Sequence, residues 1–139
     1  MKVLALDTAT TDLVTGIVDT DTGESIDRVI SGTRAHNEQL IPTIEELLAD
    51  ASLTYSDLSA IVVGTGPGPF TGLRVGMATA SALGVALHLP VHGVCTLDAI
   101  AHGRTGEWLV AIDARRKEVY WATYADGKRL SGPNVSKPE

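Results

Sequence analysis

A segment rich in glycine and proline is the part of this sequence best suited to hold a ligand. It runs from Gly64 to Gly76 as Gly-Thr-Gly-Pro-Gly-Pro-Phe-Thr-Gly-Leu-Arg-Val-Gly. Glycines allow backbone angles that are closed to other residues, and prolines fix their own φ, so the pattern predicts a rigid turn. An apolar run from Ala60 to Val63 precedes this turn, and Thr71 stands where an N-cap would begin a helix. The segment therefore predicts a strand, a tight turn and the start of a helix.

A helix that starts after a glycine-rich turn can bind a phosphate. The N–H groups of Gly72 and Leu73, the positive end of the helix and the Arg74 guanidinium would hold the anion together. The pattern is neither a Walker loop nor a Rossmann fingerprint, because no Gly-Lys-Ser/Thr follows and the glycine spacing differs. A tight connection that binds nothing is the alternative interpretation.

Asp7 is the second candidate for chemistry, at the end of an apolar run and beside Thr8, Thr10 and Thr11. A carboxylate at the end of a strand and next to hydroxyls can organise magnesium. It can also cap the turn through its own side chain, and we favour this second role. The residues of the candidate phosphate site, which we expect to be degenerate, are Asp7, Thr71, Gly72 and Arg74.

No complete catalytic or metal site is visible in the sequence. A nuclease with two metals needs several carboxylates, and the strand that ends at Gly64 brings glycine and threonine where a second acid is wanted. The segment His36-Asn-Glu38 lacks the paired histidines of a helical zinc site. No serine or cysteine stands in a recognisable nucleophile setting, and we interpret Cys95 as a small buried residue. We predict no catalytic residues and no metal ligands.

The length, composition and charge of the chain restrict which kinds of protein it can be. The chain has 139 residues, enough for one full domain and a fragment, and its 44% hydrophobic content is that of a folded protein. A net charge of −6 disfavours direct binding of nucleic acid, and we interpret Arg115-Arg116-Lys117 as a solvated turn. One cysteine, no visible signal peptide and no apolar stretch of about 20 residues predict a cytoplasmic protein without a membrane segment.

Hydrophobic periodicity places these candidates on secondary structure. It predicts strands at 2–8, 13–19, 25–30, 60–63 and 91–94, helices through 40–51, 71–88 and 97–102, and a second pair of strands at 107–113 and 118–124. Pro42 either kinks a helix that began near Ala35 or lies in the first turn of a helix that begins later. The polar tail from Asp126 to Glu139 is expected to be frayed.

The order of these elements indicates an α/β protein with a ribonuclease H-like domain, which actin-like ATPases use twice. We expect the first copy over residues 1–104 and the beginning of a second, incomplete copy over residues 105–139.

Small residues recur every four positions in the predicted helix 71–88, at Gly72, Gly76, Ala80 and Gly84. One face of the helix would then be a groove of bare backbone along which another helix could approach closely. Tight packing on the chain's own sheet is the alternative.

Four segments together resemble the bacterial TsaB (YeaZ) family. They are Leu-Ala-Leu-Asp-Thr-Ala-Thr at 4–10, the amphipathic stretch 33–48, Gly-Pro-Gly-Pro-Phe-Thr-Gly-Leu-Arg, and Ala-Ile-Asp-Ala-Arg-Arg-Lys-Glu-Val-Tyr at 111–120. The resemblance runs from residue 1 to about residue 124 and keeps the order of the family's motifs. Pro69 departs from the family, which usually has a serine there, and this removes one backbone donor and one hydroxyl from the turn. Family members also continue through a complete second domain, so we expect a C-terminally truncated member.

The resemblance implies a non-catalytic subunit. It would support TsaD, which transfers a threonylcarbamoyl group to the tRNA adenosine next to the anticodon, with the ATPase TsaE as a further partner and tRNA reached only through the complex. It also implies pairing through helices of the first domain, with TsaD or, when TsaD is absent, with a second copy. The expected interface residues are Leu40, Ile44, Gly72, Gly76, Ala80 and Gly84.

No intrinsic cofactor is expected, apart from weak nucleotide binding at the interface with TsaD. The alternative function is that of an active actin-like ATPase or sugar-kinase-like enzyme that uses Asp7 and the Gly64–Gly76 loop.

Overall fold

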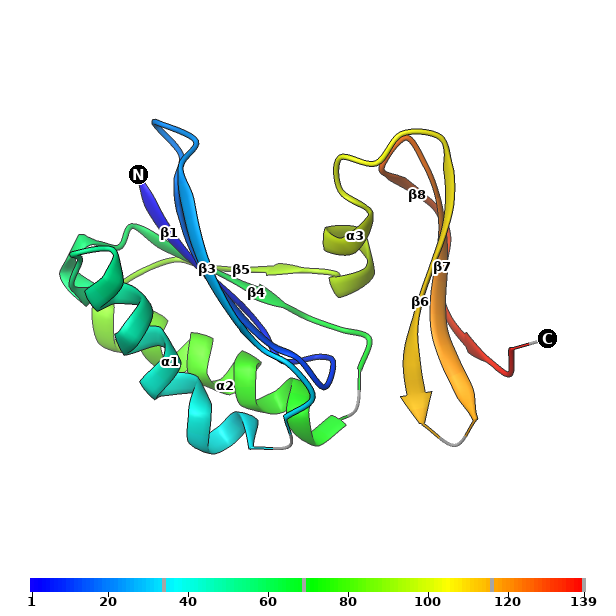
Figure 1. Cartoon of the computed structure of the whole chain (residues 1–139), viewed down its shortest axis with the longest axis horizontal. Coiled ribbons are helices and arrows are strands. Elements are labelled where there is room, and N and C mark those ends of the chain that lie inside the picture. The colour runs from blue at the N-terminus through cyan, green and yellow to red at the C-terminus, as the bar shows by residue number, and fades with distance from the viewer. Residues whose placement is uncertain (34, 69, 116, 139) are drawn as a thin grey trace.

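The computed structural model describes residues 1–33, 35–68, 70–115 and 117–138. The strands of the first sheet are β1 (Lys2–Asp7), β2 (Leu13–Asp19), β3 (Ser25–Ile30), β4 (Ala60–Gly64) and β5 (Val91–Val94). The helices are α1 (His36–Asp50), α2 (Phe70–Leu87), the short α3 (Thr96–Ala101) and a 3₁₀ turn, η1 (Tyr55–Asp57). A second sheet consists of β6 (Glu107–Arg115), β7 (Glu118–Ala125) and β8 (Lys128–Ser136). Helices α1 and α2 lie on one side of the first sheet, and α3 lies between the two sheets (Figure 1).

The first sheet has the strand order β3-β2-β1-β4-β5. β1 pairs antiparallel with β2, where Leu4 lies opposite Ile17, and parallel with β4, where Leu4 lies beside Ile61. β5 continues the sheet parallel to β4. An antiparallel meander that continues into parallel strands is the ribonuclease H-like arrangement, as the element order predicted.

Strand alternation brings the apolar side chains of the first sheet to the face that α1 and α2 cover. Leu4 and Leu6 of β1 are buried there, together with Leu13 and Ile17 of β2. The residues that alternate with these in each strand, such as Val14 and Gly16 of β2, lie on the opposite face of the sheet. This face borders a cavity that is described below.

α1 begins at His36, directly after Ala35, and continues through Pro42. This agrees with the predicted helix that began near Ala35. Pro42 lies on the exposed side of the helix, while Thr43 next to it is buried and donates its hydroxyl to the carbonyl of Gln39 at 2.6 Å.

Two predicted boundaries are wrong. α2 begins at Phe70, so Thr71 lies inside the helix and does not cap it. The tail does not fray, because β8 pairs antiparallel with β7 from Lys128 to Ser136. All nine residues of β8 are exposed, so the strand depends on backbone pairing and carries no hydrophobic pattern.

The expected groove of small residues on α2 faces inward. A Cβ added to Gly76 would lie 2.5 Å from Oγ1 of Thr8, and one added to Gly84 would lie 2.4 Å from a methyl group of Val91. Ala80 is 0% exposed. The glycines therefore let α2 approach the chain's own sheet, which corrects the interpretation of this stripe as an open surface for another helix.

The other expected interface residues are also covered by the chain itself. Leu40 and Ile44 of α1 are 1% and 0% exposed and belong to the core beneath the first sheet. A Cβ added to Gly72 would lie 3.2 Å from the carbonyl oxygen of Thr8. Five of the six expected interface positions are thus buried within the chain itself, whereas Gly72 is half-buried.

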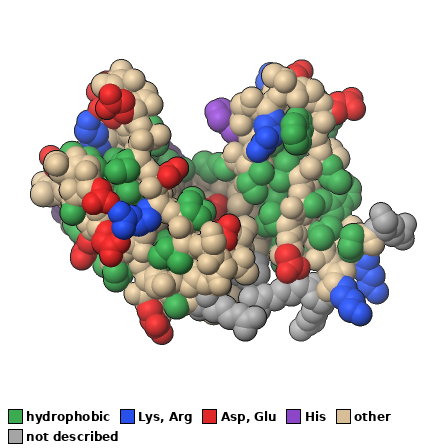
Figure 2. All heavy atoms as spheres, viewed as in Figure 1, with side chains coloured by type: hydrophobic (Ala, Val, Ile, Leu, Met, Phe, Trp, Pro, Cys, Tyr) green, Lys and Arg blue, Asp and Glu red, His purple; other side chains and the backbone are tan. Residues whose placement is uncertain are grey.

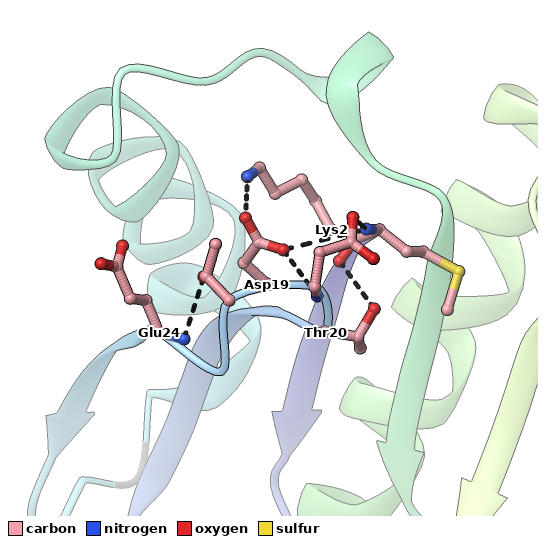
Figure 3. A network of polar contacts seen from close by, with 7 residues as sticks. Lys2, Asp19, Thr20 and Glu24 are labelled. Carbon is pink, nitrogen blue, oxygen red and sulfur yellow. Dashed lines mark hydrogen bonds and ion pairs between the residues drawn. The ribbon is translucent and has the colours of Figure 1, made fainter.

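A polar network holds the start of β1 against the β2–β3 turn (Figure 3). The ammonium group of Lys2 bonds the carboxylate of Asp19, and the amino terminus of Met1 donates to the carboxylate of Asp21 at 2.6 Å. The backbone N–H of Thr20 donates to the carbonyl of Met1 at 2.9 Å. The hydrogen bond from Lys2 lowers the pKa of Asp19 to about 2.

Candidate functional site

Asp7 lies at the carboxyl end of β1, half-buried, with both of its carboxylate oxygens hydrogen-bonded to the chain itself. Oδ1 accepts the backbone N–H of Ala9 at 2.7 Å, and Oδ2 accepts the hydroxyl of Thr96 at 2.8 Å. The bond to Ala9 closes a turn two residues long, so the interpretation of Asp7 as a turn cap is confirmed. Burial raises the pKa of Asp7 above its usual value, and the two hydrogen bonds oppose this shift.

The absence of a side chain at Gly64 leaves room for the carboxylate of Asp7. A Cβ at position 64 would lie 1.9 Å from Oδ2 and 2.2 Å from Cγ of Asp7, which no side chain can tolerate. The glycine at the end of β4 therefore allows a carboxylate to lie against the neighbouring strand.

The Gly-Pro turn is tied to α3 and to the β1–β2 turn. The N–H of Gly66 donates to the hydroxyl of Thr96 at 3.1 Å, and the N–H of Thr96 donates to the carbonyl of Gly66 at 2.7 Å. Gly66 has a φ of 92°, which favours glycine. A Cβ on Gly68 would lie 2.1 Å from the carbonyl oxygen of Ala9. Backbone of the same chain thus fills the space beside Gly68, and the donor at Gly66 is already used.

Thr8 connects β1 to α2. Its hydroxyl donates to the carbonyl of Gly72 at 2.6 Å and accepts the N–H of Gly76 at 2.9 Å. These two groups are the acceptor and donor of one helical turn, so the threonine hydroxyl bonds both ends of a turn of α2. Thr8 is 1% exposed. This contact explains why the first half of α2 needs glycines.

The predicted phosphate-site residues are not brought together. Asp7 lines a cavity of about 770 Å³ on the face of the first sheet that α1 and α2 do not cover. Thr71 and Gly72 line a smaller hollow of about 320 Å³ near the start of α2, and Arg74 lines neither of the two. Pro69, which stands where the family usually has a serine, lies outside the described residues, as does Arg116 of the basic cluster.

The residues present do not fit a magnesium nucleotide. The part of the chain that the structure describes contains no group of three or more His, Cys, Asp or Glu placed to hold a metal ion, so Asp7 has no second metal ligand of these types beside it. Within the same residues, no helix has both the length and the hydropathy to cross a membrane.

The contacts of three residues in this region were not predicted from the sequence: those of Thr8, Thr96 and His36. Thr96 lies far from Asp7 in sequence, and no local pattern pairs them. His36 is 7% exposed and its Nε2 lies 3.0 Å from the carbonyl oxygen of Thr10, so it fixes the β1–β2 turn against the start of α1. The other three histidines, His88, His92 and His102, are exposed.

Comparisons with known proteins show what this chain is similar to. The family model described as "TsaD: tRNA N6-adenosine threonylcarbamoyltransferase" matches residues 29–139. An uncharacterized protein of Mycobacterium tuberculosis is 56% identical over 135 residues, which cover 96% of this chain and 64% of that protein. The tRNA threonylcarbamoyladenosine biosynthesis protein TsaB of Escherichia coli is 36% identical over 129 residues, which cover 89% of this chain and 55% of TsaB.

A solved structure of a related protein has the same fold as this chain. YeaZ from Pseudomonas aeruginosa matches with a TM-score of 0.85 and 30% identity, covering 99% of this chain and 67% of YeaZ. The predicted α/β fold of ribonuclease H-like, actin-like type is confirmed. The chain spans between 39% and 64% of the length of the mycobacterial relatives it matches.

Proposed function

The chain belongs to the TsaB (YeaZ) family, and on that premise we propose that it is a non-catalytic subunit that supports TsaD in forming threonylcarbamoyladenosine in tRNA. Two features support a role without chemistry of its own. The carboxylate of Asp7 acts as a turn cap, and the Gly-Pro turn is bonded to α3. Neither feature favours the alternative of an active ATPase or sugar kinase that uses Asp7 and the Gly64–Gly76 loop.

The observation that carries the proposal is the outer face of α2. The exposed residues that the structure describes on this helix recur at helical spacing and include one charged residue: Thr71, Arg74, Met77, Ala78, Ser81, Ala82, Val85 and Ala86. Met77 is 39% exposed and Val85 is 79% exposed. The outer face of the neighbouring α1 is different, because it carries Glu38, Glu45, Glu46 and Asp50. The outer face of α2 thus combines small side chains and exposed apolar side chains without an acid.

Such a surface fits a helix from a partner. Small residues let helix axes come close, and burying an apolar side chain that was fully exposed contributes about 1.5–3 kcal/mol. We propose that TsaD covers this face and that, in its absence, a second copy of the chain does so with two-fold symmetry. This replaces the inward-facing stripe as the basis for pairing.

Sedimentation of the chain with and without TsaD of the same organism tests the proposal. Val85→Glu places a charge at the most exposed apolar residue of the proposed surface, near the C-terminal end of α2, and it should weaken the complex with TsaD by at least about tenfold, or about 1.4 kcal/mol. Leu109→Glu is the matched control, because Leu109 of β6 is 64% exposed and lies away from α2. Complexes that tolerate Val85→Glu as well as Leu109→Glu would show that α2 is not the pairing surface.

The remaining partners follow from the same proposal. TsaE would join through the complex, tRNA would be reached only through TsaD, and the complex would work in the cytoplasm. We expect no nucleotide to bind this chain by itself, and weak nucleotide binding where it meets TsaD. The division into domains over 1–104 and 105–139 is likewise a proposal, which the separate sheets on either side of α3 support.

A further inference from the structure

A cavity lies between the open face of the first sheet and a wall formed by α3 and the start of the second sheet. Residues of β1, β2 and β4 form one wall, and residues of α3 and β6 form the other. Figure 2 shows the surface hollowed between these two parts of the molecule. The volume of about 770 Å³ falls in the range of small-molecule sites.

Apolar side chains face this cavity from both walls. Val14 of β2 is 38% exposed, Val94 of β5 is 37% exposed and Ile100 of α3 is 40% exposed, and all three line the cavity. Apolar surface removed from water contributes about 25 cal/mol per Å². A ligand with an aliphatic body would therefore gain free energy by covering these three side chains.

The charge of the cavity has one sign. Its lining includes the aspartates Asp7, Asp12 and Asp27, and no lysine, arginine or histidine is found among its described lining residues. The chain as a whole carries a net charge of −6. A phosphorylated ligand would be repelled from such a site, whereas a cation would be attracted.

The carboxylate of Asp7 has capacity for one more donor. A carboxylate offers about four acceptor positions, and Asp7 uses one on each oxygen, for the N–H of Ala9 and the hydroxyl of Thr96. These two bonds fix the orientation of the carboxylate at the wall of the cavity. A bound ammonium group would meet an acceptor that is already held in place.

We propose that this cavity binds a small organic cation, with its ammonium group on the carboxylate of Asp7 and its aliphatic body against Val14, Val94 and Ile100. This inference does not depend on the role with TsaD, because it uses the face of the sheet opposite α1 and α2. It also predicts that the cavity discriminates against the nucleotides that actin-like folds bind.

Calorimetry and NMR with three probes of equal length test the proposal. Hexylammonium should bind at neutral pH, hexanol should bind at least about tenfold more weakly, and hexanoate should not bind. Bound hexylammonium should shift the methyl resonances of Val14, Val94 and Ile100. Asp7→Asn should reduce the affinity for hexylammonium to that for hexanol and leave hexanol unchanged.

A second pair of variants keeps the test independent of Asp7. Ala99→Phe fills the cavity from the exposed side of α3 and should abolish binding of hexylammonium. Ala49→Phe makes the same change on the exposed side of α1, which does not line the cavity, and should preserve binding. The proposal is overturned if hexylammonium does not bind, if hexanoate binds equally well, or if Ala99→Phe has no effect.

Discussion

Gly76 of α2 is the position at which the contact between sheet and helix can be tested most sharply. A Cβ at this position would lie 2.5 Å from Oγ1 and 3.3 Å from Cγ2 of Thr8, whereas the next atom, Cδ1 of Leu6, is 3.4 Å away. Nearly all of the conflict thus comes from one side chain. We predict that Gly76→Ala destabilises the wild-type chain but stabilises a chain that already carries Thr8→Ala.

The magnitude follows from three contributions. Alanine in place of glycine favours a helix by about 1 kcal/mol. Overpacking against Thr8 costs about 1–3 kcal/mol. Displacing the Thr8 hydroxyl from Gly72 and Gly76 loses two hydrogen bonds, each with a net contribution of about 0.5–1.5 kcal/mol. These contributions sum to an expected net loss of about 1–5 kcal/mol in the wild-type background, against a gain of up to about 1 kcal/mol when Thr8 is alanine.

Urea unfolding of the four chains of this double-mutant cycle, followed by far-ultraviolet circular dichroism, measures both free energies. The denaturant dependence should stay constant across the four chains, because none of the changes alters the surface exposed on unfolding. A coupling energy of about 3 kcal/mol is at the upper end of those found for residues in direct contact. Equal effects of Gly76→Ala in the two backgrounds would refute the interpretation of this glycine as a spacer for Thr8.

Three further changes test other contacts. Gly64→Ala should lower the melting temperature far more than Gly16→Ala, because its Cβ would lie 1.9 Å from Asp7, whereas the nearest atom to a Cβ at Gly16 is at 3.5 Å. Asp19→Asn should lower the free energy of unfolding at neutral pH. The pKa of Asp19 is about 2 in the folded chain and near 3.8 in the unfolded chain, so the carboxylate stabilises the fold only where it is ionised. The difference in unfolding free energy between wild type and Asp19→Asn should therefore shrink as the pH falls below about 4 and vanish near pH 2. Tyr124→Phe, which removes a buried hydroxyl bonded at 2.6 Å to a carboxylate of α3, should cost about 1–3 kcal/mol in urea unfolding, and a change within error would show that this bond is dispensable.

The elements that the sequence predicted well are those with a strong local pattern. β2 and β3 occupy the predicted ranges, because apolar alternation and a turn rich in aspartate, threonine and glycine mark their ends. β8 was missed because its side chains are exposed throughout and include Pro133. Pairing with β7 depends on the partner strand, which a local pattern does not contain.

The candidate site was predicted only in part, because some of its contacts join neighbours in the sequence and others join distant residues. Asp7 was identified as a turn cap from its neighbours alone, because that hydrogen bond spans two residues. Its second bond, to Thr96, depends on the packing of α3 near the end of β4. Helical periodicity showed that Gly76 and Gly84 share a face of α2, but only the structure shows that the sheet covers this face.

The central proposal, that this chain supports TsaD without chemistry of its own, is tested most directly by transfer of a labelled threonylcarbamoyl group to tRNA. The assay compares TsaD with its other partners in the presence and absence of this chain, together with the chain alone. We predict that the chain raises the yield of modified tRNA from TsaD, that Val85→Glu removes this effect while Leu109→Glu keeps it, and that the chain alone transfers nothing. Transfer by the chain alone, or equal yields from TsaD with and without it, would contradict the proposed function.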